Sequence, residues 1–411
     1  MWRKLAVHRR ENDTCRAEWA RSLGNLAGCL GAFGRLGEAI EKAKTSELIW
    51  GDLAGHQPDV YRADWAGSIT NLATHLSEAG RFDEALEKGQ TAELILRELA
   101  TLQPDSYRAD WAMSIGNLAN RLSDLGRFDE AIEKAQSSEV MWCELAGSQP
   151  DAHRADWARS LENLGIHLGA VARCEEAVER VEVAKAMWRN LADLQPDAYR
   201  AELAWSLGNL AIHLSVLGRF AESVEAAQAA EVMCRDLAER QPNAYRVYWA
   251  WVLSVFAKSK LNGRDFPAAV TTAGKAIDQF QLLEPERMRS RASWVGWAHR
   301  VYAAALKRCQ SQNIAPHNTR IPGRVRLRRS ANHRRFGECN ACASQADAHH
   351  HKSCIVVSSV SASFKRRLEF RWRRNVDGDD HHPVAHSPAD DVNRSATVRS
   401  AATAIPVSPS G

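Results

Sequence analysis

A segment of 46 residues recurs along the first three quarters of this chain. The copy that runs from Asp105 to Pro150 reads DSYRADWAMSIGNLANRLSDLGRFDEAIEKAQSSEVMWCELAGSQP, and altered versions of it lie on both sides. Self-similarity at a fixed period of this length is typical of helical repeat arrays. One landmark position returns every 46 residues, as Trp19, Trp65, Trp111, Trp157, Leu203 and Trp249. The period predicts a stack of similar units, each of which contacts mainly its neighbours.

Within one copy, five apolar residues follow the spacing of a helix. They are separated by 4, 3, 4 and 3 positions: Trp111, Ile115, Leu118, Leu122 and Leu125. Residues at these intervals share one stripe of an α-helix, which we name helix A. Gly126 then interrupts the pattern, because glycine accepts the left-handed conformation that other residues resist at a helix end.

A second run of helical spacing, from Phe128 to Leu145, predicts helix B, which packs back antiparallel on helix A. Pro150 is expected to end helix B, and the next residue to cap the next helix A, since its side chain can accept bonds from free amides. The expected capping residues are Asp59, Asp105, Asp151, Asp197 and Asn243. One repeat is therefore a helical hairpin. The sequence predicts an all-α, right-handed α-solenoid of antiparallel hairpins.

The repeat divides the chain into three parts. Residues 1–12 are expected to form a partial helix of an incomplete repeat, 13–310 the array, and 311–411 a basic, low-complexity tail that is disordered. The A and B helices are expected at about 13–33 and 35–55, 59–79 and 81–101, 105–125 and 127–148, 151–171 and 173–194, 197–217 and 219–240, and 243–261 and 264–283. A final A-type helix, at about 288–310, has no B partner.

The third copy resembles the tetratricopeptide repeat (TPR). The resemblance rests on Leu118, Ala119, Leu122, Gly126, Arg127, Phe128, Glu130 and Ala131. The Asn-Leu-Ala phrase and the long helices resemble the subclass found in kinesin light chains and in bacterial and fungal signalling arrays. The resemblance covers residues 1–309 and implies that helix A forms an inner, concave groove that binds a peptide or a partner protein.

Charge is distributed unevenly. Residues 311–411 hold 16 Lys and Arg and 8 Asp and Glu, a net charge of +8, whereas residues 1–310 hold 38 and 42, a net charge of −4. The basic character therefore belongs to the tail. Within it, residues 320–335 contain seven arginines and no acid, enough to bind a polyanion in a salt-dependent way. That feature alone does not predict a nucleic-acid partner.

The sequence indicates a cytoplasmic protein without a membrane partner. No apolar core of about 7 to 15 residues follows the initial charges, as a secretory signal would require. The longest apolar stretch, from Val247 to Ala257, is too short to cross a bilayer. The cysteines of the array lie in different helices without paired spacing, so we expect buried thiols and no disulfides.

The candidate site is a polar position that recurs on helix A. It holds Asn25, Asn71, Asn117, Asn163 and Asn209, with Val255 in the sixth copy. The resemblance implies that these amides bond the backbone of an extended peptide, for which an amide offers both a donor and an acceptor. The alternative is a structural bond to the backbone of the neighbouring repeat.

One helical turn after these asparagines lies a second column: Cys29, His75, Arg121, His167 and His213. Plain solvent exposure is the default for such side chains. If the column lines the groove, it favours a peptide with acidic or C-terminal carboxylate groups. Trp205 and Trp251 stand two residues out of the tryptophan column, which turns them toward the groove as a candidate apolar anchor. The tryptophans of the column itself are expected in the core.

Two further features have plain explanations. Arginines of the connector, such as Arg62 and Arg108, precede an acid by two residues and are expected in surface ion pairs with it. In the tail, four side chains offer ligands of the types that zinc takes, namely Cys339, Cys342, His349 and Cys354. Their spacing matches no zinc-finger class, so we predict no zinc site.

No catalytic constellation is present, because the histidines repeat with the structure instead of converging with a nucleophile and a carboxylate. We therefore predict no enzyme and no cofactor. The favoured interpretation is a protein-interaction scaffold. Two alternatives stay open: a polyanion-associated protein that acts through its Arg-rich tail, and a non-functional fragment of a larger TPR signalling protein. Self-association through the incomplete N-terminal repeat also stays open.

Overall fold

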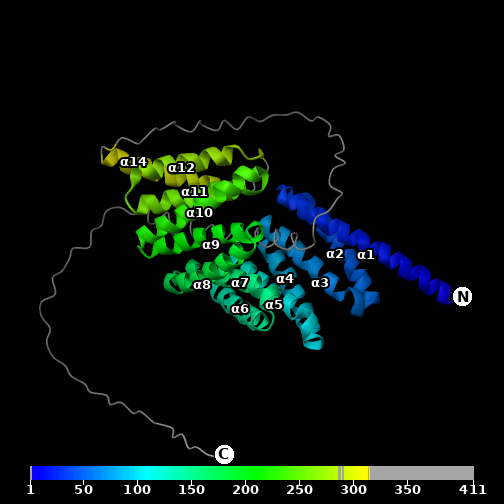
Figure 1. The fold of residues 1–411 in the computed structure, drawn as a ribbon. Coiled ribbons are helices and arrows are strands. Elements are labelled where there is room, and N and C mark those ends of the chain that lie inside the picture. Colours follow the sequence, from blue (N-terminus) through cyan, green and yellow to red (C-terminus); the bar gives the residue numbers. More distant parts are fainter. Residues whose placement is uncertain (1, 286–287, 289–290, 313, 315–411) are drawn as a thin grey trace, which may run out of the picture. The chain divides into compact units, whose positions relative to one another are not determined.

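The computed structural model describes the backbone of residues 2–285, 288, 291–312 and 314, and the side chains from Asn12 onward. These residues form 13 α-helices and no strand, and the helices follow one another in antiparallel pairs (Figure 1). The predicted all-α array of helical hairpins is confirmed. The tail expected at 311–411 lies, from 315 onward, outside the described residues.

Seven helices are of the A type and six of the B type. The A helices are α1 (Trp2–Ala32), α3 (Pro58–Glu78), α5 (Pro104–Asp124), α7 (Pro150–Ala170), α9 (Pro196–Val216), α11 (Pro242–Asn262) and α14 (Ala292–Ser311). The B helices are α2 (Leu36–His56), α4 (Phe82–Leu102), α6 (Phe128–Ser148), α8 (Cys174–Leu194), α10 (Phe220–Arg240) and α12 (Phe266–Gln281). Residues 2–12 and the first A helix are one continuous helix, α1.

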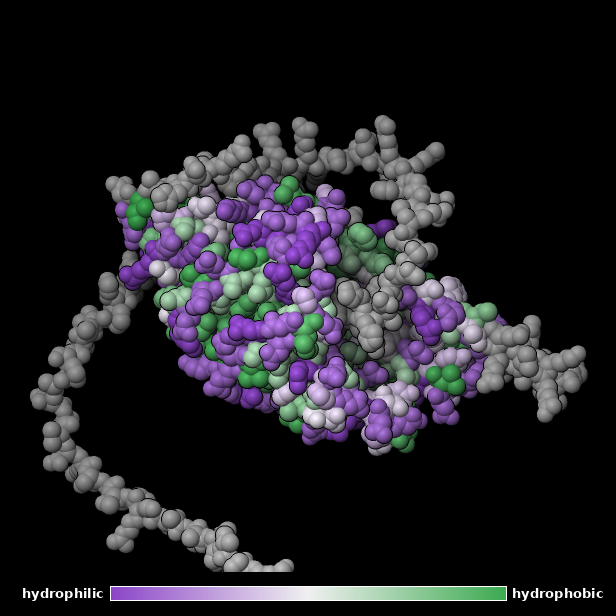
Figure 2. Space-filling view, viewed as in Figure 1, coloured by the Kyte–Doolittle hydropathy of each residue, from purple (hydrophilic) through white to green (hydrophobic). Residues whose placement is uncertain are grey.

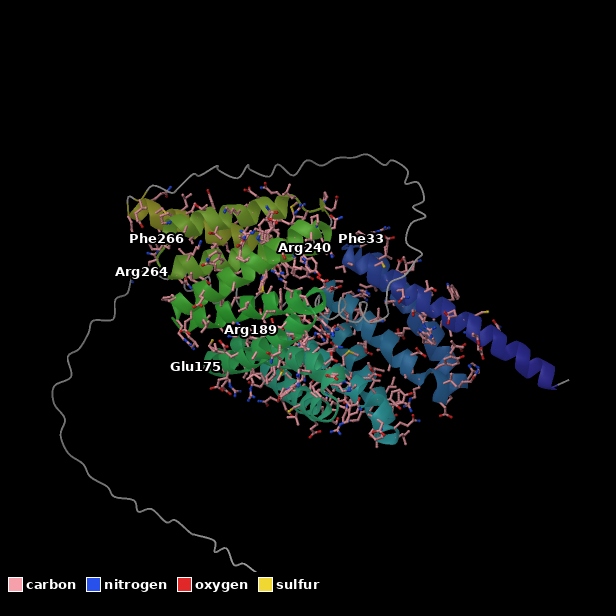
Figure 3. All side chains as sticks on the ribbon, viewed as in Figure 1. Phe33, Glu175, Arg189, Arg240, Arg264 and Phe266 are labelled. Carbon is pink, nitrogen blue, oxygen red and sulfur yellow. The ribbon has the colours of Figure 1, made fainter. Side chains whose placement is uncertain are left out.

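The turn from helix A to helix B is closed by backbone bonds around a left-handed residue. After α3, the amide of Gly80 donates to Ser77 O (3.0 Å) and the amide of Arg81 to Leu76 O (2.9 Å), the pattern of a Schellman cap. Gly80 has φ +81° and Gly126 φ +80°, as predicted for the turn glycine. The left-handed residue is Ala172 after α7 and Arg264 after α11, both at φ +67°. Figure 3 labels Arg264 beside Phe266, where α12 begins.

The connector from helix B to the next helix A is shorter than predicted. A single residue, such as Gln57 between α2 and α3, separates the helices, and Pro58 is the first helical residue. Proline suits this position because its φ is already helical and its missing N–H would have no partner there. The prediction that Pro150 ends a B helix is therefore wrong: it begins α7.

The expected capping residues are the second residue of each helix, two positions after the N-cap residue. Gln57 is the N-cap residue of α3, it makes no side-chain capping bond, and Asp59 stands in the first turn. There a carboxylate still interacts favourably with the positive end of the helix dipole. The same correction applies to Asp105, Asp151, Asp197 and Asn243.

Each hairpin is held by a close approach of its two helices at one alanine of helix A. This alanine is fully buried in all six copies: Ala20, Ala66, Ala112, Ala158, Ala204 and Ala250. The Ser46 hydroxyl of α2 donates to the Ala20 carbonyl (2.7 Å), and the Ser138 hydroxyl of α6 to the Ala112 carbonyl (2.7 Å). Small side chains let the two backbones approach closely enough for these bonds.

Successive A helices also contact each other, whereas successive B helices make at most marginal contact. Each helix A thus lies between its own helix B, the preceding helix B, and two neighbouring A helices. The largest hydrophobic core cluster extends from α7 to α14 and includes Trp188, which is fully buried. On the face seen in Figure 2, most of the surface is hydrophilic, with separate hydrophobic patches between.

The tryptophan column was expected inside the core. It lies instead at the edge of the core. The rings of Trp111, Trp157 and Trp249 are half-buried. Their indole N–H groups donate to a carboxylate of the preceding helix B, namely Glu93, Glu139 and Glu231, at 2.9, 2.9 and 3.1 Å. Trp19 has no preceding helix B among the described residues, and it is 58% exposed.

The burial of the cysteines varies along the array. Cys174, Cys234 and Cys309 are buried as expected, but Cys15 and Cys29 are exposed, because they lie on sides of α1 that no described helix covers. The six cysteines of the described part are free thiols.

Of the described helices, none combines the length and apolarity needed to span a membrane.

Candidate functional site

One side of α1, α3, α5, α7 and α9 is left open by the neighbouring helices. The second polar column, to which His75 belongs, contacts the preceding helix A: His75 of α3 lies against Gly31 of α1. Another side of helix A contacts the following helix A: Gly208 of α9 lies against Trp251 of α11. Between these two directions lie residues spaced 3 and 4 apart, for example Asp64, Gly67 and Asn71. We call this open row along α1, α3, α5, α7 and α9 the A-helix stripe.

The A-helix stripe consists of three residues from each helix A. They are Glu18, Arg21 and Asn25 on α1; Asp64, Gly67 and Asn71 on α3; Asp110, Met113 and Asn117 on α5; Asp156, Arg159 and Asn163 on α7; and Glu202, Trp205 and Asn209 on α9. Most of them are exposed or half-buried, and Asn209 is buried. The first and third positions are conserved in chemistry along the chain, whereas the middle one changes from repeat to repeat.

The asparagines of the stripe have no hydrogen-bond partner among the described residues. Asn71, Asn117 and Asn163 are half-buried, and their side-chain amides make no hydrogen bond to any described residue. The Nδ2 atom of Asn209 is buried and also without a partner. The structural bond to a neighbouring repeat, which was the alternative role for this column, is not formed by these four side chains.

The second column does not share the open surface. His75, Arg121, His167 and His213 are at most 7% exposed, which corrects the expectation of solvent exposure, and only Cys29 is exposed. They lie between successive A helices. A Cβ atom built on Gly31 would come within 2.8 Å of His75, and one built on Gly169 within 2.4 Å of His213. Glycine at these two positions makes room for the imidazole of the next repeat.

The junction between α3 and α5 is a network of paired polar groups. The Arg121 guanidinium, 2% exposed, donates to the Thr74 hydroxyl (2.9 Å). Burial lowers the pKa of Arg121, and the nearby Asp124 and Glu78 oppose that shift. The Ser77 hydroxyl donates to the Asp124 carboxylate. These groups are buried together with charge of both signs, and each helix supplies part of the network.

The junctions of α7 with α5 and with α9 contain ionisable groups that burial keeps neutral: His167 faces α5, and Glu162 and His213 lie between α7 and α9. His167 has no exposed surface and no partner for either ring nitrogen. Burial lowers the pKa values of His167 and His213 to about 4. Burial also raises the pKa of Glu162 to about 8, although Ser206 and Arg159 favour its charged form. Glu162 takes a position that holds glycine, serine or threonine in the other copies.

Trp205 and Trp251, the expected apolar anchor, lie together at one end of the stripe. Their rings are stacked with centroids 4.3 Å apart, and the ring of Trp294 on α14 lies 6.0 Å from that of Trp251 and 6.4 Å from that of Trp205. Trp251 is 7% exposed and packs beneath the Trp205 ring on its buried side, whereas Trp205 is half-buried. Trp205 is therefore the member of this pair that retains a surface for contact.

The acidic residues at the first position of the stripe were not predicted as part of a site. From the sequence, each was expected to form an ion pair with the arginine two residues before it. In the structure, those arginines turn away and pair with helix B of the same repeat. Arg62 pairs with Glu98, Arg108 with Glu144, and Arg16 with Asp52 at 2.6 Å. The constant separation of 36 residues in these pairs was a signal available in the sequence.

No set of three metal-ligating side chains comes together in the described part of the chain. The four zinc candidates of the tail, Cys339, Cys342, His349 and Cys354, lie outside the described residues, as do the arginines at 320–335.

The comparisons with known proteins agree with the repeat and the fold. Residues 111–134 match the family model described as tetratricopeptide repeat, within the copy on which the predicted resemblance rests. That copy thus matches the tetratricopeptide repeat, and the described part of the chain is an array of helical hairpins of which it is one. No curated protein matches its sequence.

Several solved structures have a similar helix arrangement at low sequence identity. BtubC (BKLC) from P. vanneervenii is 17% identical over 72% of this chain and 99% of that one, with a TM-score of 0.45. The Rap conjugation gene regulator of plasmid pLS20, solved with the Phr* peptide, is 13% identical over 70% and 74%, with a TM-score of 0.43. A putative kinesin light chain repeat protein from Podospora anserina is 21% identical over 55% and 98%, with a TM-score of 0.38.

Proposed function

We propose that this chain is a non-catalytic scaffold that binds an extended segment of a partner protein along the A-helix stripe. The observation that carries the proposal is the column of unpartnered asparagines. Asparagine is a poor helix former, so three half-buried ones at the same position have a cost that no hydrogen bond to a described residue offsets. A primary amide offers a donor and an acceptor at a fixed spacing, which is what the backbone of an extended segment requires.

The variable position of the stripe is suited to selectivity. Each of the five repeats presents an acid and an asparagine around a central residue that varies, namely Arg21, Gly67, Met113, Arg159 or Trp205. A partner backbone bound by the amides would place successive side chains against these different residues. Trp205, backed by Trp251 and Trp294, offers the aromatic surface on which an apolar partner side chain would rest.

The test is a peptide-library selection against the full chain and two triple variants. One variant carries Asn71→Ala, Asn117→Ala and Asn163→Ala. The matched control carries Gln90→Ala, Gln136→Ala and Gln228→Ala, which remove three exposed amides from one recurrent position of the B helices. We expect selected peptides to bind the parent and the control and to lose at least about tenfold in affinity for the asparagine variant. Peptides that bind all three proteins equally would contradict the proposal.

A second candidate function is self-association through α1. Trp19, Leu26 and Phe33 are spaced seven apart on one side of α1 and are 58, 46 and 64% exposed. In later repeats this side is covered by the preceding helix B, and Figure 3 labels Phe33 at the C-terminal end of α1. A row of large apolar side chains of this kind marks an interaction surface. Sedimentation equilibrium of Trp19→Glu, with Leu48→Glu on α2 as the control, tests whether this surface forms an oligomer.

A further inference from the structure

The A-helix stripe and its immediate surroundings carry far more acidic than basic groups. The carboxyl groups along the open side and between the A helices from α1 to α9 belong to Glu18, Asp64, Glu78, Asp110, Asp124, Asp156, Glu162 and Glu202. The guanidinium groups on the same sides belong to Arg21, Arg121 and Arg159. This reverses the preference for an acidic peptide that the sequence suggested, because the histidines and Arg121 on which it rested are buried.

The excess of negative charge is concentrated over α3 and α5. Arg21 on α1 is paired with Glu18 (2.7 Å), and Arg159 on α7 with Asp156 (2.8 Å). In the two repeats between them, the central position of the stripe holds Gly67 and Met113 in place of arginine. Arg121, the remaining cation, is buried against Thr74.

The carboxyl group of Asp64 shows the effect of this arrangement. Its pKa is raised because the group is partly buried, and Arg21 of the neighbouring α1 only partly opposes the shift. Asp64 is still exposed at the surface, so an approaching cation can reach its carboxylate and stabilise the charged form. The ligand expected over α3 and α5 is therefore an extended segment rich in positive charge, with a backbone that Asn71 and Asn117 can bond.

The chain itself supplies such a segment. Residues 320–335 contain seven arginines and no acid, at a distance of six residues from Ile314, the last described residue. An extended chain spans at most about 3.3 to 3.6 Å per residue, so the middle of this segment, 13 residues after Ile314, can reach roughly 45 Å from it. Packed helices are about 10 Å apart, so α5, four A helices before α14, is at a similar distance.

We propose that the Arg-rich segment 320–335 docks on the A-helix stripe over α3 and α5, with its guanidinium groups on Asp64 and Asp110. The inference rests on the proposed function, because it assigns an occupant to the same surface. A tethered segment acts at an effective concentration of order millimolar, so moderate intrinsic affinity is sufficient to keep it bound. An outside partner then binds only by displacing this segment, which makes the tail a competitive regulator of the scaffold.

The test is photo-cross-linking of the full chain. The photoreactive residue p-benzoylphenylalanine replaces Met113, which is in the stripe on α5, and in a control chain it replaces Val140, which is 52% exposed on α6. We expect cross-links from position 113 to residues 319–335 within single chains, at least about tenfold more than from position 140. Their yield should fall as the salt concentration rises from about 0.05 to about 0.5 M, because exposed charge pairs are screened.

Charge reversal separates a specific contact from general attraction. The pair Asp64→Lys and Asp110→Lys should reduce the yield by about tenfold, and adding Arg324→Glu, Arg326→Glu and Arg328→Glu in the same chain should restore it. Equal cross-linking from positions 113 and 140, cross-links only between different chains, or a yield that reversal leaves unchanged would each overturn self-docking.

The proposed function has its own readout. A chain in which all seven arginines of 320–335 are replaced by glutamine has a free stripe if the tail is the occupant, and should select peptides more readily than the parent. If this variant selects peptides that depend on Asn71 and Asn117 while cross-linking fails, self-docking is wrong and the scaffold function stands. If cross-linking succeeds and no peptide depends on these asparagines, the scaffold function is wrong.

Discussion

The α3–α5 and α7–α9 junctions fill the same position of the repeat in two different ways. Between α3 and α5 the position holds Arg121, a charged group surrounded by Thr74, Glu78 and Asp124. At the α7–α9 junction the corresponding position holds His213, and His167 lies one repeat before it, both buried and without a counterion. One junction keeps its charges by pairing them, and the other keeps its ionisable groups neutral.

The difference teaches where the array is sensitive to pH. A charged network that is paired in the folded state does not depend on protonation near neutral pH, whereas neutral buried groups with displaced pKa values do. Because the stability of a repeat array is close to a sum of local interface terms, each junction contributes its own dependence. The α7–α9 junction should therefore lose stability on both sides of a narrow pH range, and the α3–α5 junction should not.

The largest effect is expected from Arg121→Ala. Removal of the guanidinium leaves a cavity and takes away the counterion of Asp124 at a site that water does not reach. Breaking a buried pair in this way costs about 4 kcal/mol of unfolding free energy. Urea unfolding monitored by circular dichroism measures the change, and hydrogen exchange should show the loss first in α3 and α5. The control is Arg127→Ala, which removes an exposed pair with Glu130 and should leave the unfolding free energy nearly unchanged.

Glu162→Gln should stabilise the protein at neutral pH. Because the folded-state pKa of Glu162 is about 8 and its ordinary value is 4.5, the folded state favours the protonated form. The parent therefore loses stability as the pH rises from 4.5 toward 8, and glutamine, which mimics the protonated acid, does not. The gain at pH 7 should be about 3 kcal/mol and should vanish near pH 4.5. Glu179→Gln, an exposed carboxyl on α8, is the control, and an equal gain in both variants would disprove the assignment.

The two histidines should destabilise the array in acid, His167 at the α5–α7 junction and His213 at the α7–α9 junction. Their folded-state pKa values are about 4, below the ordinary 6.5, so protonation favours the unfolded state. Stability is therefore lost as the pH falls from 6.5 toward 4, by about 2 kcal/mol for each histidine at pH 5. The difference in unfolding free energy between pH 7 and pH 5 should shrink in His167→Gln and in His213→Gln. It should stay as in the parent in His56→Gln, which changes an exposed side chain.

The architecture could be predicted because its determinants are local and are repeated. The spacing of apolar residues specified two helices per copy, and Gly126 marked the turn between them. What failed was the detail of the connector, where the aspartates suggested an N-cap while the proline one residue earlier already began the helix. Two local signals competed, and the conformational restriction of proline decided the outcome.

The candidate site was harder to predict because burial depends on how far apart successive helices lie. His75 and Asn71 are one helical turn apart and have similar polarity, yet one is buried and the other half-exposed. The distinguishing signal was the glycine of the neighbouring repeat, Gly31 for His75 and Gly169 for His213. Likewise, the partner of Arg62 lies 36 residues away on helix B, so no reading of nearby residues alone would have found it.

The smallest effect concerns the turns that lack a left-handed glycine. Ala172 after α7 and Arg264 after α11 both have φ +67°, whereas the other four turns have glycine at φ +78° to +81°. A residue with a side chain costs about 1 kcal/mol more than glycine in this conformation. Ala172→Gly should therefore raise the unfolding free energy, measured by urea unfolding, but by less than about 1 kcal/mol because glycine also gains freedom in the unfolded chain.

The sixth repeat offers a matched test of the same argument, because it already contains the glycine one residue too early. Gly263 has φ −74° and needs no special freedom, while the next residue, Arg264, takes the left-handed position. Exchanging the two, as Gly263→Arg with Arg264→Gly, keeps the composition and so leaves the unfolded chain nearly unchanged. We expect a gain of similar size to that of Ala172→Gly. A loss would show that contacts of the Arg264 side chain, not backbone strain, determine this turn.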